Sequence, residues 1–157
     1  MFQLSAEGQQ FVKKELARYE TKESAIIPSL YQVQKENDGW VSEDAITHLS
    51  QLMEIPEARI NEVFQFYTMF NKEPVGKYHV QVCCNVACCM AGTREMLSSF
   101  LKEYKVKPGD ITTDGRFTFT AVECLGACDK APMMQINDDY HEGLTLDSAK
   151  NILQGLK

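Results

Sequence analysis

Six cysteines, gathered in two short segments, constrain this chain more than any other feature. The first cysteine segment, VCCNVACCMAG at residues 82–92, holds four of them, and the second, ECLGACDKAP at residues 123–132, holds two. No other cysteine occurs among the 157 residues. Such grouping is typical of a disulfide framework, a redox dithiol, a zinc site or an iron–sulfur cluster. The six residues are Cys83, Cys84, Cys88, Cys89, Cys124 and Cys128.

A disulfide framework is the least favoured of these alternatives, because such frameworks belong mainly to short secreted chains. The N-terminal sequence, MFQLSAEGQQFVKKELARYE, mixes acidic and basic residues and is unlike a secretion signal or a transit peptide. We therefore expect a cytoplasmic protein with reduced cysteines. A thioredoxin-type dithiol requires Cys-x-x-Cys, a spacing that is absent from both segments.

The remaining choice lies between zinc and iron–sulfur. The spacings are Cys-x4-Cys, twice over, in the first cysteine segment and Cys-x3-Cys in the second. Structural zinc sites usually contain a tighter Cys-x2-Cys turn, whereas plant-type 2Fe–2S sites use an x4 gap. Spacing alone thus favours an iron–sulfur cluster over zinc, with incidental thiols as a third alternative.

Charge and hydropathy exclude two classes of partner. The formal net charge is −6, and no basic stripe runs along the chain, so a nucleic-acid partner is not expected. No apolar run approaches the roughly 20 residues that span a bilayer, so direct membrane insertion is not expected either.

Residues 1–72 carry helical periodicity. Four short amphipathic helices are predicted, with Pro28, Ser42 and Pro56 at or near the starts of the second, third and fourth. Short connections between them predict a small bundle. The aromatic segment FQFYTMF, residues 64–70, has helical spacing and is expected in the core.

Residues 73–157 change to strand periodicity. Strands are predicted at residues 78–83, 117–124 and 133–136, with helices at residues 92–104 and from Thr145 onward. Both cysteine segments would then follow the carboxyl ends of strands, where α/β folds place their chemistry. The expected fold class is α+β, a small helical bundle followed by a compact α/β domain.

The two cysteine segments and two segments of the helical half resemble those of a known family. The first cysteine segment is similar to the signature Cys-x-Asn-x-x-Cys-x-x-x-Gly, and the second to Cys-Leu-Gly-x-Cys-x-x-Ala-Pro. DGWVSEDAI and FYTMF are similar to landmarks of the same family's helical domain. The family is the thioredoxin-like 2Fe–2S subunit of NADH:quinone oxidoreductase (respiratory complex I), with relatives in NAD-linked hydrogenases and formate dehydrogenases.

The resemblance implies which cysteines bind the cluster. Cys83, Cys88, Cys124 and Cys128 fall on the ligand positions, so the second domain would be a thioredoxin-like 2Fe–2S ferredoxin domain. The remaining pair, Cys84 and Cys89, would then be buried or half-buried small side chains, although this pair at the same x4 spacing is the alternative ligand set. Small residues nearby, Gly92, Gly126 and Ala127, are expected to let backbone N–H groups approach the cluster sulfurs. The three histidines, His48, His79 and His141, are expected to be structural or surface residues.

The resemblance also implies the function. The chain would exchange single electrons with the flavin of an NADH-binding partner subunit, onto which its helical half would dock. It would not be catalytic alone, and it contains no dinucleotide-binding fingerprint of its own. It could reside peripherally on the cytoplasmic face of the inner membrane as part of the complex. Three alternatives stay open: the diaphorase module of a hydrogenase or formate dehydrogenase, a free-standing ferredoxin, and a structural zinc scaffold.

Overall fold

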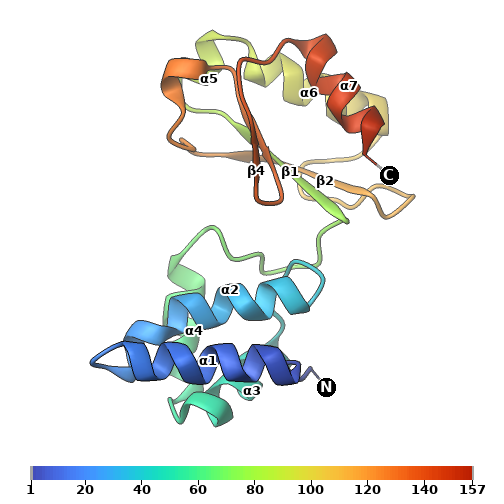
Figure 1. Ribbon diagram of the computed structural model, residues 1–157. Helices are drawn as coiled ribbons and strands as arrows, with labels where there is room; N and C mark the ends of the chain where they lie inside the picture. The colour runs from blue at the N-terminus through green and yellow to red at the C-terminus, as the bar shows by residue number, and fades with distance from the viewer. Residues whose placement is uncertain (1, 157) are drawn as a thin grey trace. The chain divides into compact units, whose positions relative to one another are not determined.

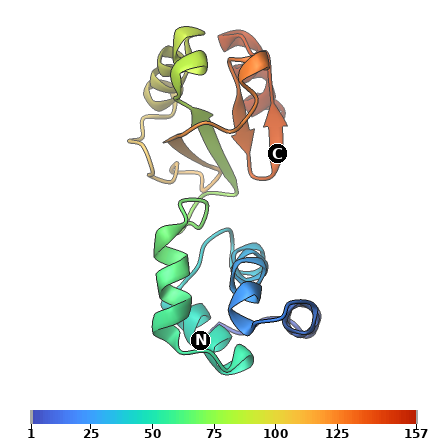
Figure 2. The same cartoon turned by 90° about the vertical axis from the view of Figure 1, so that its left-hand side faces the viewer.

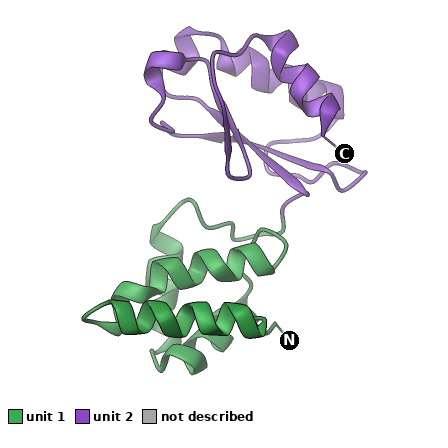
Figure 3. Cartoon of the chain, viewed as in Figure 1, with its two compact units in different colours: residues 1–74 green, residues 75–157 purple. Residues whose placement is uncertain are grey.

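The structure is a computed structural model that describes residues 2–156. The chain divides into two compact units, a first unit of residues 1–74 and a second unit of residues 75–157 (Figure 3). Within the described range, no helix is long and apolar enough to cross a bilayer.

Four α-helices form the first unit (Figure 1). Ser42 caps the third by accepting a hydrogen bond from the Ala45 N–H, as its position in the sequence predicts. Pro56 lies immediately before the fourth, also as predicted, whereas Pro28 lies inside the first turn of the second, where a missing N–H costs no helical hydrogen bond. The elements are α1 (Ala6–Arg18), a 3-10 turn (Lys22–Ala25), α2 (Ile26–Glu36), α3 (Glu43–Met53) and α4 (Glu57–Phe66).

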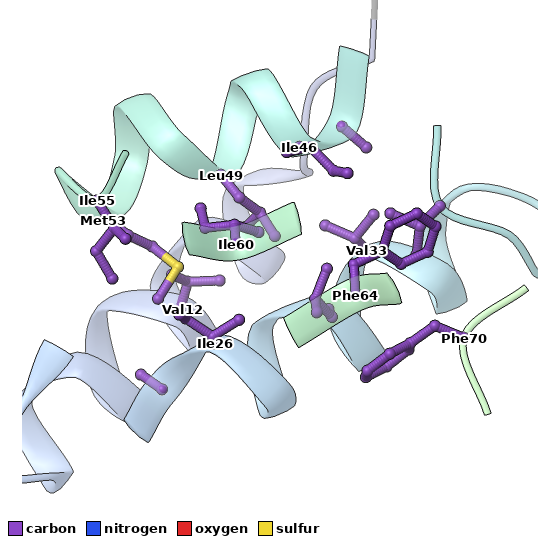
Figure 4. Close-up of a cluster of buried hydrophobic side chains, with 14 of the residues drawn as sticks. Val12, Ile26, Val33, Ile46, Leu49, Met53, Ile55, Ile60, Phe64 and Phe70 are labelled. Atoms are coloured by element: carbon purple, nitrogen blue, oxygen red, sulfur yellow. The ribbon is translucent and has the colours of Figure 1, made fainter. Parts of the chain in front are cut away.

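One hydrophobic core joins these helices, and all four contribute to it (Figure 4). Its labelled members include Val12, Ile26, Val33, Leu49, Met53, Ile60 and Phe64. The aromatic segment at residues 64–70 is only partly in this core. Phe64 and Phe70 are buried, but Phe66 is 77% exposed. The expectation of burial is wrong for Phe66 because residues i and i+2 do not share a helix face.

A four-stranded sheet organises the second unit (Figures 1 and 2). The strand order is β2-β1-β3-β4; β1 and β2 are parallel, and β3 is antiparallel to both β1 and β4. The strands are β1 (Tyr78–Cys83), β2 (Phe117–Val122), β3 (Met134–Ile136) and β4 (Asp139–His141). The helices are α5 (Val86–Met90), α6 (Thr93–Tyr104), a 3-10 turn (Cys128–Lys130) and α7 (Leu146–Gly155).

Helices α6 and α7 pack against the same hydrophobic cluster of the sheet. The cluster combines buried residues of β1, β2, β3, α6 and α7: Val80, Val82, Met96, Phe100, Phe117, Phe119, Met134, Ala149 and Leu153. Thr145 begins α7 with a capping box, in which its side chain and that of Ser148 exchange hydrogen bonds with each other's backbone N–H. The predicted start of the last helix at Thr145 is confirmed.

The predicted fold class is confirmed, with three local corrections. β2 ends at Val122 rather than at Cys124, so the second cysteine segment is a loop that contains the 3-10 turn Cys128–Lys130. Helix α5 and strand β4 were not predicted. Five residues are too few to show a helical period, and β4 is a short, largely exposed and polar segment without apolar alternation.

Candidate functional site

The parallel pairing of β1 and β2 brings the two cysteine segments to one edge of the sheet. Cys83, the last residue of β1, stands opposite Val122, the last residue of β2. The Cys84 N–H then donates to the Val122 carbonyl at 2.8 Å. Beyond the strands, the Asn85 side-chain amide donates to the Glu123 carboxylate at 3.2 Å, which ties one segment to the other.

Cys83 and Cys88 form a buried pair. Each is 2% exposed, and both belong to a small hydrophobic cluster with Met133. The Cys83 N–H donates to the Met133 carbonyl at 3.3 Å. Asn85 precedes α5 and its side chain accepts a hydrogen bond from the Val86 N–H, so that the short helix begins there and carries Cys88 back toward Cys83.

Cys124 and Cys128 form an exposed pair in the second cysteine segment. Their sulfur atoms are 3.3 Å apart. Gly126, between them, has a φ of +85°, a conformation that glycine adopts without strain. Its N–H donates to the Cys124 sulfur at 3.4 Å. This N–H therefore reaches the sulfur of one of the four cysteines that the resemblance implies as cluster ligands.

Residues around the Met133 cluster connect the two pairs. Leu125, Ala127 and Ala131, all from the second cysteine segment, pack against the cluster that contains Cys83 and Cys88. The sulfurs of the exposed pair are thus carried by a loop that covers the buried pair.

Strand β4 and the residues after it anchor this loop. The Tyr140 hydroxyl donates to the Leu125 carbonyl at 2.7 Å, and the Gly143 N–H donates to the Lys130 carbonyl at 2.8 Å. Lys130 and Glu142 form an ion pair at 3.2 Å. These anchors were missed in the sequence because β4 itself carries no strand signal.

The thiols perturb one another's pKa values. Burial, followed by hydrogen bonding with Cys83, raises the pKa of Cys88 to about 11. The hydrogen bond with Cys124 and the charge of Cys124 raise the pKa of Cys128. The Gly126 N–H, followed by the Cys128 thiol, lowers the pKa of Cys124. The loop thus favours the thiolate at Cys124, which is the form that binds metal.

Cys84 and Cys89 are half-buried, as predicted. Cys84 packs against the hydrophobic cluster of the sheet, α6 and α7, whereas Cys83 belongs to the cluster with Met133. The Cys89 thiol donates to the Cys84 carbonyl at 3.0 Å. Adjacent residues of a strand point to opposite faces, which explains the separation of Cys83 from Cys84.

Gly92, His48 and His79 have structural roles. Gly92 precedes α6 with a φ of +96°, and its N–H donates to the Cys89 carbonyl at 3.1 Å. His79 is buried, lies 2.8 Å from the Thr120 hydroxyl, and has its pKa lowered to about 4 by burial. His48 accepts a hydrogen bond from the Leu4 N–H.

The donors at this edge of the sheet fit a cluster of two irons. Thiolate sulfur is the usual ligand of such clusters, each iron requires two of them, and here four thiols lie in two pairs. The Gly126 N–H supplies the hydrogen bond that commonly tunes such sites. Among residues 2–156, no three His, Cys, Asp or Glu side chains converge as the ligands of a single metal ion.

Comparison with known proteins gives relatives along almost the whole chain. It is 41% identical over 138 residues to a subunit of NADH-quinone oxidoreductase from Rickettsia bellii, covering 88% of this chain and 83% of that protein. It is 39% identical over 158 residues to the mitochondrial NADH dehydrogenase [ubiquinone] flavoprotein 2 of Dictyostelium discoideum, covering 99% of this chain and 64% of that protein.

Among solved structures, the chain is similar to an NAD+-reducing [NiFe]-hydrogenase in the air-oxidized state. The TM-score is 0.69 at 23% identity, over 82% of this chain and 22% of the hydrogenase chain. At this identity the similarity concerns the fold, and this chain spans about a fifth of the hydrogenase chain.

The sequence model of one family, described as thioredoxin-like [2Fe-2S] ferredoxin, matches residues 12–157. The match includes both cysteine segments and most of the helical unit, and it confirms the resemblance that the two cysteine signatures indicate. This chain therefore belongs to the thioredoxin-like [2Fe-2S] ferredoxin family, whose cofactor is a 2Fe–2S cluster.

Proposed function

We propose that this protein is the electron-transfer subunit of an NADH:quinone oxidoreductase and that Cys83, Cys88, Cys124 and Cys128 hold its 2Fe–2S cluster. The observation that carries the proposal is that two thiol pairs follow the ends of two paired parallel strands, and that the loop carrying one pair packs against the cluster containing the other. This arrangement occurs in a chain 41% identical to a bacterial NADH-quinone oxidoreductase subunit.

Two of the four proposed ligands are buried and two are exposed. When bound, a 2Fe–2S cluster supplies a centre that accepts and returns one electron at a time. Cys83 and Cys88 would hold it from the protein interior, and Cys124 and Cys128 from the surface. The Gly126 N–H, which points to the Cys124 sulfur, would stabilise negative charge there and so raise the reduction potential.

The surface pair also indicates where an electron can enter or leave. Because Cys124 and Cys128 are exposed, a redox partner could approach that side of the site closely. We infer that this partner is the flavin- and NADH-binding subunit of the same complex. The protein then performs no hydride chemistry of its own and acts as a redox subunit in the cytoplasm, without inserting into the membrane.

The two units would have separate tasks. Residues 1–72 would dock on the partner, and residues 73–157 would carry the cluster. Phe66, at the end of α4, supports the docking role because an aromatic side chain 77% exposed to water is well suited to an interface.

The proposal is tested by replacing the cysteines one at a time and comparing the proposed ligands with Cys84 and Cys89. The chain is purified without oxygen and analysed for iron and acid-labile sulfide, and the dithionite-reduced protein is examined by EPR. We expect two irons, two sulfides and a one-electron signal in the wild type, in Cys84→Ala and in Cys89→Ala. Ser substitution of any of the four proposed ligands should alter or abolish that signal.

The outcomes distinguish the alternatives. Zinc without sulfide would make the protein a structural scaffold. Loss of the signal in Cys84→Ala or Cys89→Ala would show that the ligand set is wrong. Co-purification with hydrogenase or formate dehydrogenase subunits, rather than with quinone oxidoreductase subunits, would correct the assembly and leave the cluster assignment unchanged.

A further inference from the structure

A surface groove of about 550 Å³ in the second unit contains two thiols that the proposed ligand set does not use. Cys84 and Cys89 both line it, and both are free thiols. They are half-buried, so small solutes can reach them from the groove. The remaining lining residues are Asn85, Val86, Met90, Arg94 and Glu95.

The two thiols are close neighbours. The Cys89 sulfur lies 3.0 Å from the carbonyl oxygen of Cys84. Only a few covalent bonds separate that oxygen from the sulfur of the same residue. The end of β1 and the helix α5 therefore hold Cys89 against residue 84 itself.

This pair is separate from the proposed cluster ligands although it is adjacent to them in sequence. Cys84 packs against the hydrophobic cluster shared by the sheet, α6 and α7. Cys83 and Cys88 belong instead to the cluster around Met133. A reaction in the groove can thus proceed without removing a ligand from the other side.

We propose that Cys84 and Cys89 are a second thiol pair, which a hydroperoxide oxidises to a disulfide while the cluster ligands stay in place. One thiol first attacks the peroxide; the O–O bond breaks, a sulfenic acid forms, and water or an alcohol leaves. The second sulfur then attacks the sulfenic sulfur, an S–S bond forms, and the hydroxyl leaves as water. Two electrons pass from the two thiols to the peroxide, which is reduced.

The disulfide would close a short loop, residues 84–89, that also carries Cys88. It would link the end of β1 to α5 on the side opposite the proposed ligands. Oxidation of the pair would thereby restrain the backbone that positions Cys83 and Cys88. The inference goes beyond the proposed electron-transfer role but rests on its ligand set.

The experiment treats the full, cluster-loaded chain with hydrogen peroxide and then alkylates the remaining thiols under denaturing conditions. Mass spectrometry locates the modified cysteines, and visible absorbance reports the cluster. We expect peroxide to abolish alkylation at Cys84 and Cys89 together, with the loss of two hydrogens from the chain. Dithiothreitol should restore both thiols, and the absorbance should remain throughout.

Cys84→Ser and Cys89→Ser serve as matched variants. Each should keep the cluster and should no longer lose two hydrogens under peroxide. The proposal is overturned if the wild type forms no disulfide, if the disulfide persists in either variant, or if the absorbance falls in step with its formation. If an untreated variant lacks the cluster, the proposed ligand set is wrong. If the untreated variants keep the cluster and the wild type forms no disulfide, only the disulfide proposal is wrong.

Discussion

At the scale of single residues, the backbone conformation of Gly126 determines whether its N–H reaches the sulfur of Cys124, a proposed cluster ligand. Its positive φ turns the N–H toward the Cys124 sulfur, and a methyl group added at its Cα would meet no other atom within 4 Å. The cost of a side chain here is thus conformational rather than steric, about 1–2 kcal/mol for a residue with a Cβ.

We therefore expect Gly126→Ala to move the loop toward negative φ, weaken the hydrogen bond and lower the reduction potential of the cluster. An EPR-monitored redox titration measures that change. Gly115→Ala is the matched control, because Gly115 also has a positive φ and open space at its Cα but makes no contact with the cysteine sulfurs. Equal potentials in the two variants would contradict the role of the Gly126 N–H.

A second prediction at this scale concerns the contribution of His79 to the pH dependence of stability. Burial lowers its pKa to about 4, so it is neutral in the folded protein, whereas in the unfolded chain it has the ordinary value of 6.5. Its contribution to stability is complete above pH 6.5 and is lost as the pH falls from 6.5 toward 4, because the unfolded state then binds an extra proton.

Between about pH 7.5 and 5.5 we expect the wild type to lose about 1 kcal/mol of unfolding free energy through this residue. His79→Gln, which cannot titrate, should lose correspondingly less over the same interval. Urea unfolding of both proteins at the two pH values, followed by circular dichroism, measures the difference. Parallel losses in the two proteins would show that another group is responsible.

At the scale of elements, β4 stabilises a loop that it does not belong to. The Tyr140 hydroxyl holds the Leu125 carbonyl in the middle of the second cysteine segment. Such a hydrogen bond is worth about 1 kcal/mol, which corresponds to a roughly fivefold change in an equilibrium. The strand with the weakest sequence signal therefore helps to position the exposed thiol pair.

Tyr140→Phe should consequently release iron to a chelator roughly fivefold faster than the wild type, as followed by the decay of visible absorbance. Tyr31→Phe is the control, since Tyr31 is a similarly exposed tyrosine in the first unit. If Tyr140→Phe decays at the wild-type rate, the anchor does not limit cluster retention.

At the scale of the whole molecule, residues 2–156 form one large hydrophobic core in the first unit and another in the second, besides the small cluster around Met133. Leu49 is fully buried in the first and Leu153 is 1% exposed in the second. A buried Leu→Ala substitution costs about 2–5 kcal/mol, because it removes burial and leaves a cavity.

Leu49→Ala should increase hydrogen exchange in residues 1–74 and leave the EPR signal of the cluster intact. Leu153→Ala should increase exchange in residues 75–157 and reduce cluster content, because α7 packs on the sheet that carries the cysteine segments. Exchange mass spectrometry of both variants, with iron analysis, tests whether the units act independently. Loss of the cluster in Leu49→Ala would show that they do not.

Features that depend on near neighbours could be predicted from the amino-acid sequence. Helical and strand periods and the caps at Ser42 and Thr145 occur in the structure as expected. These features arise from the conformational preferences and hydrogen bonds of residues a few positions apart, so the sequence is sufficient to predict them.

Features that depend on distant partners were set by tertiary packing. It buried Cys83 and Cys88 while leaving Cys124 and Cys128 exposed, and it placed Cys84 against a different hydrophobic cluster. Strand β4 pairs with β3, its neighbour in the chain, and β3 is held in the sheet by its pairing with the distant β1. The burial of the cysteines and the pairing of β1 with β2 and β3 result from contacts between segments far apart in the chain, which no local pattern of residues contains.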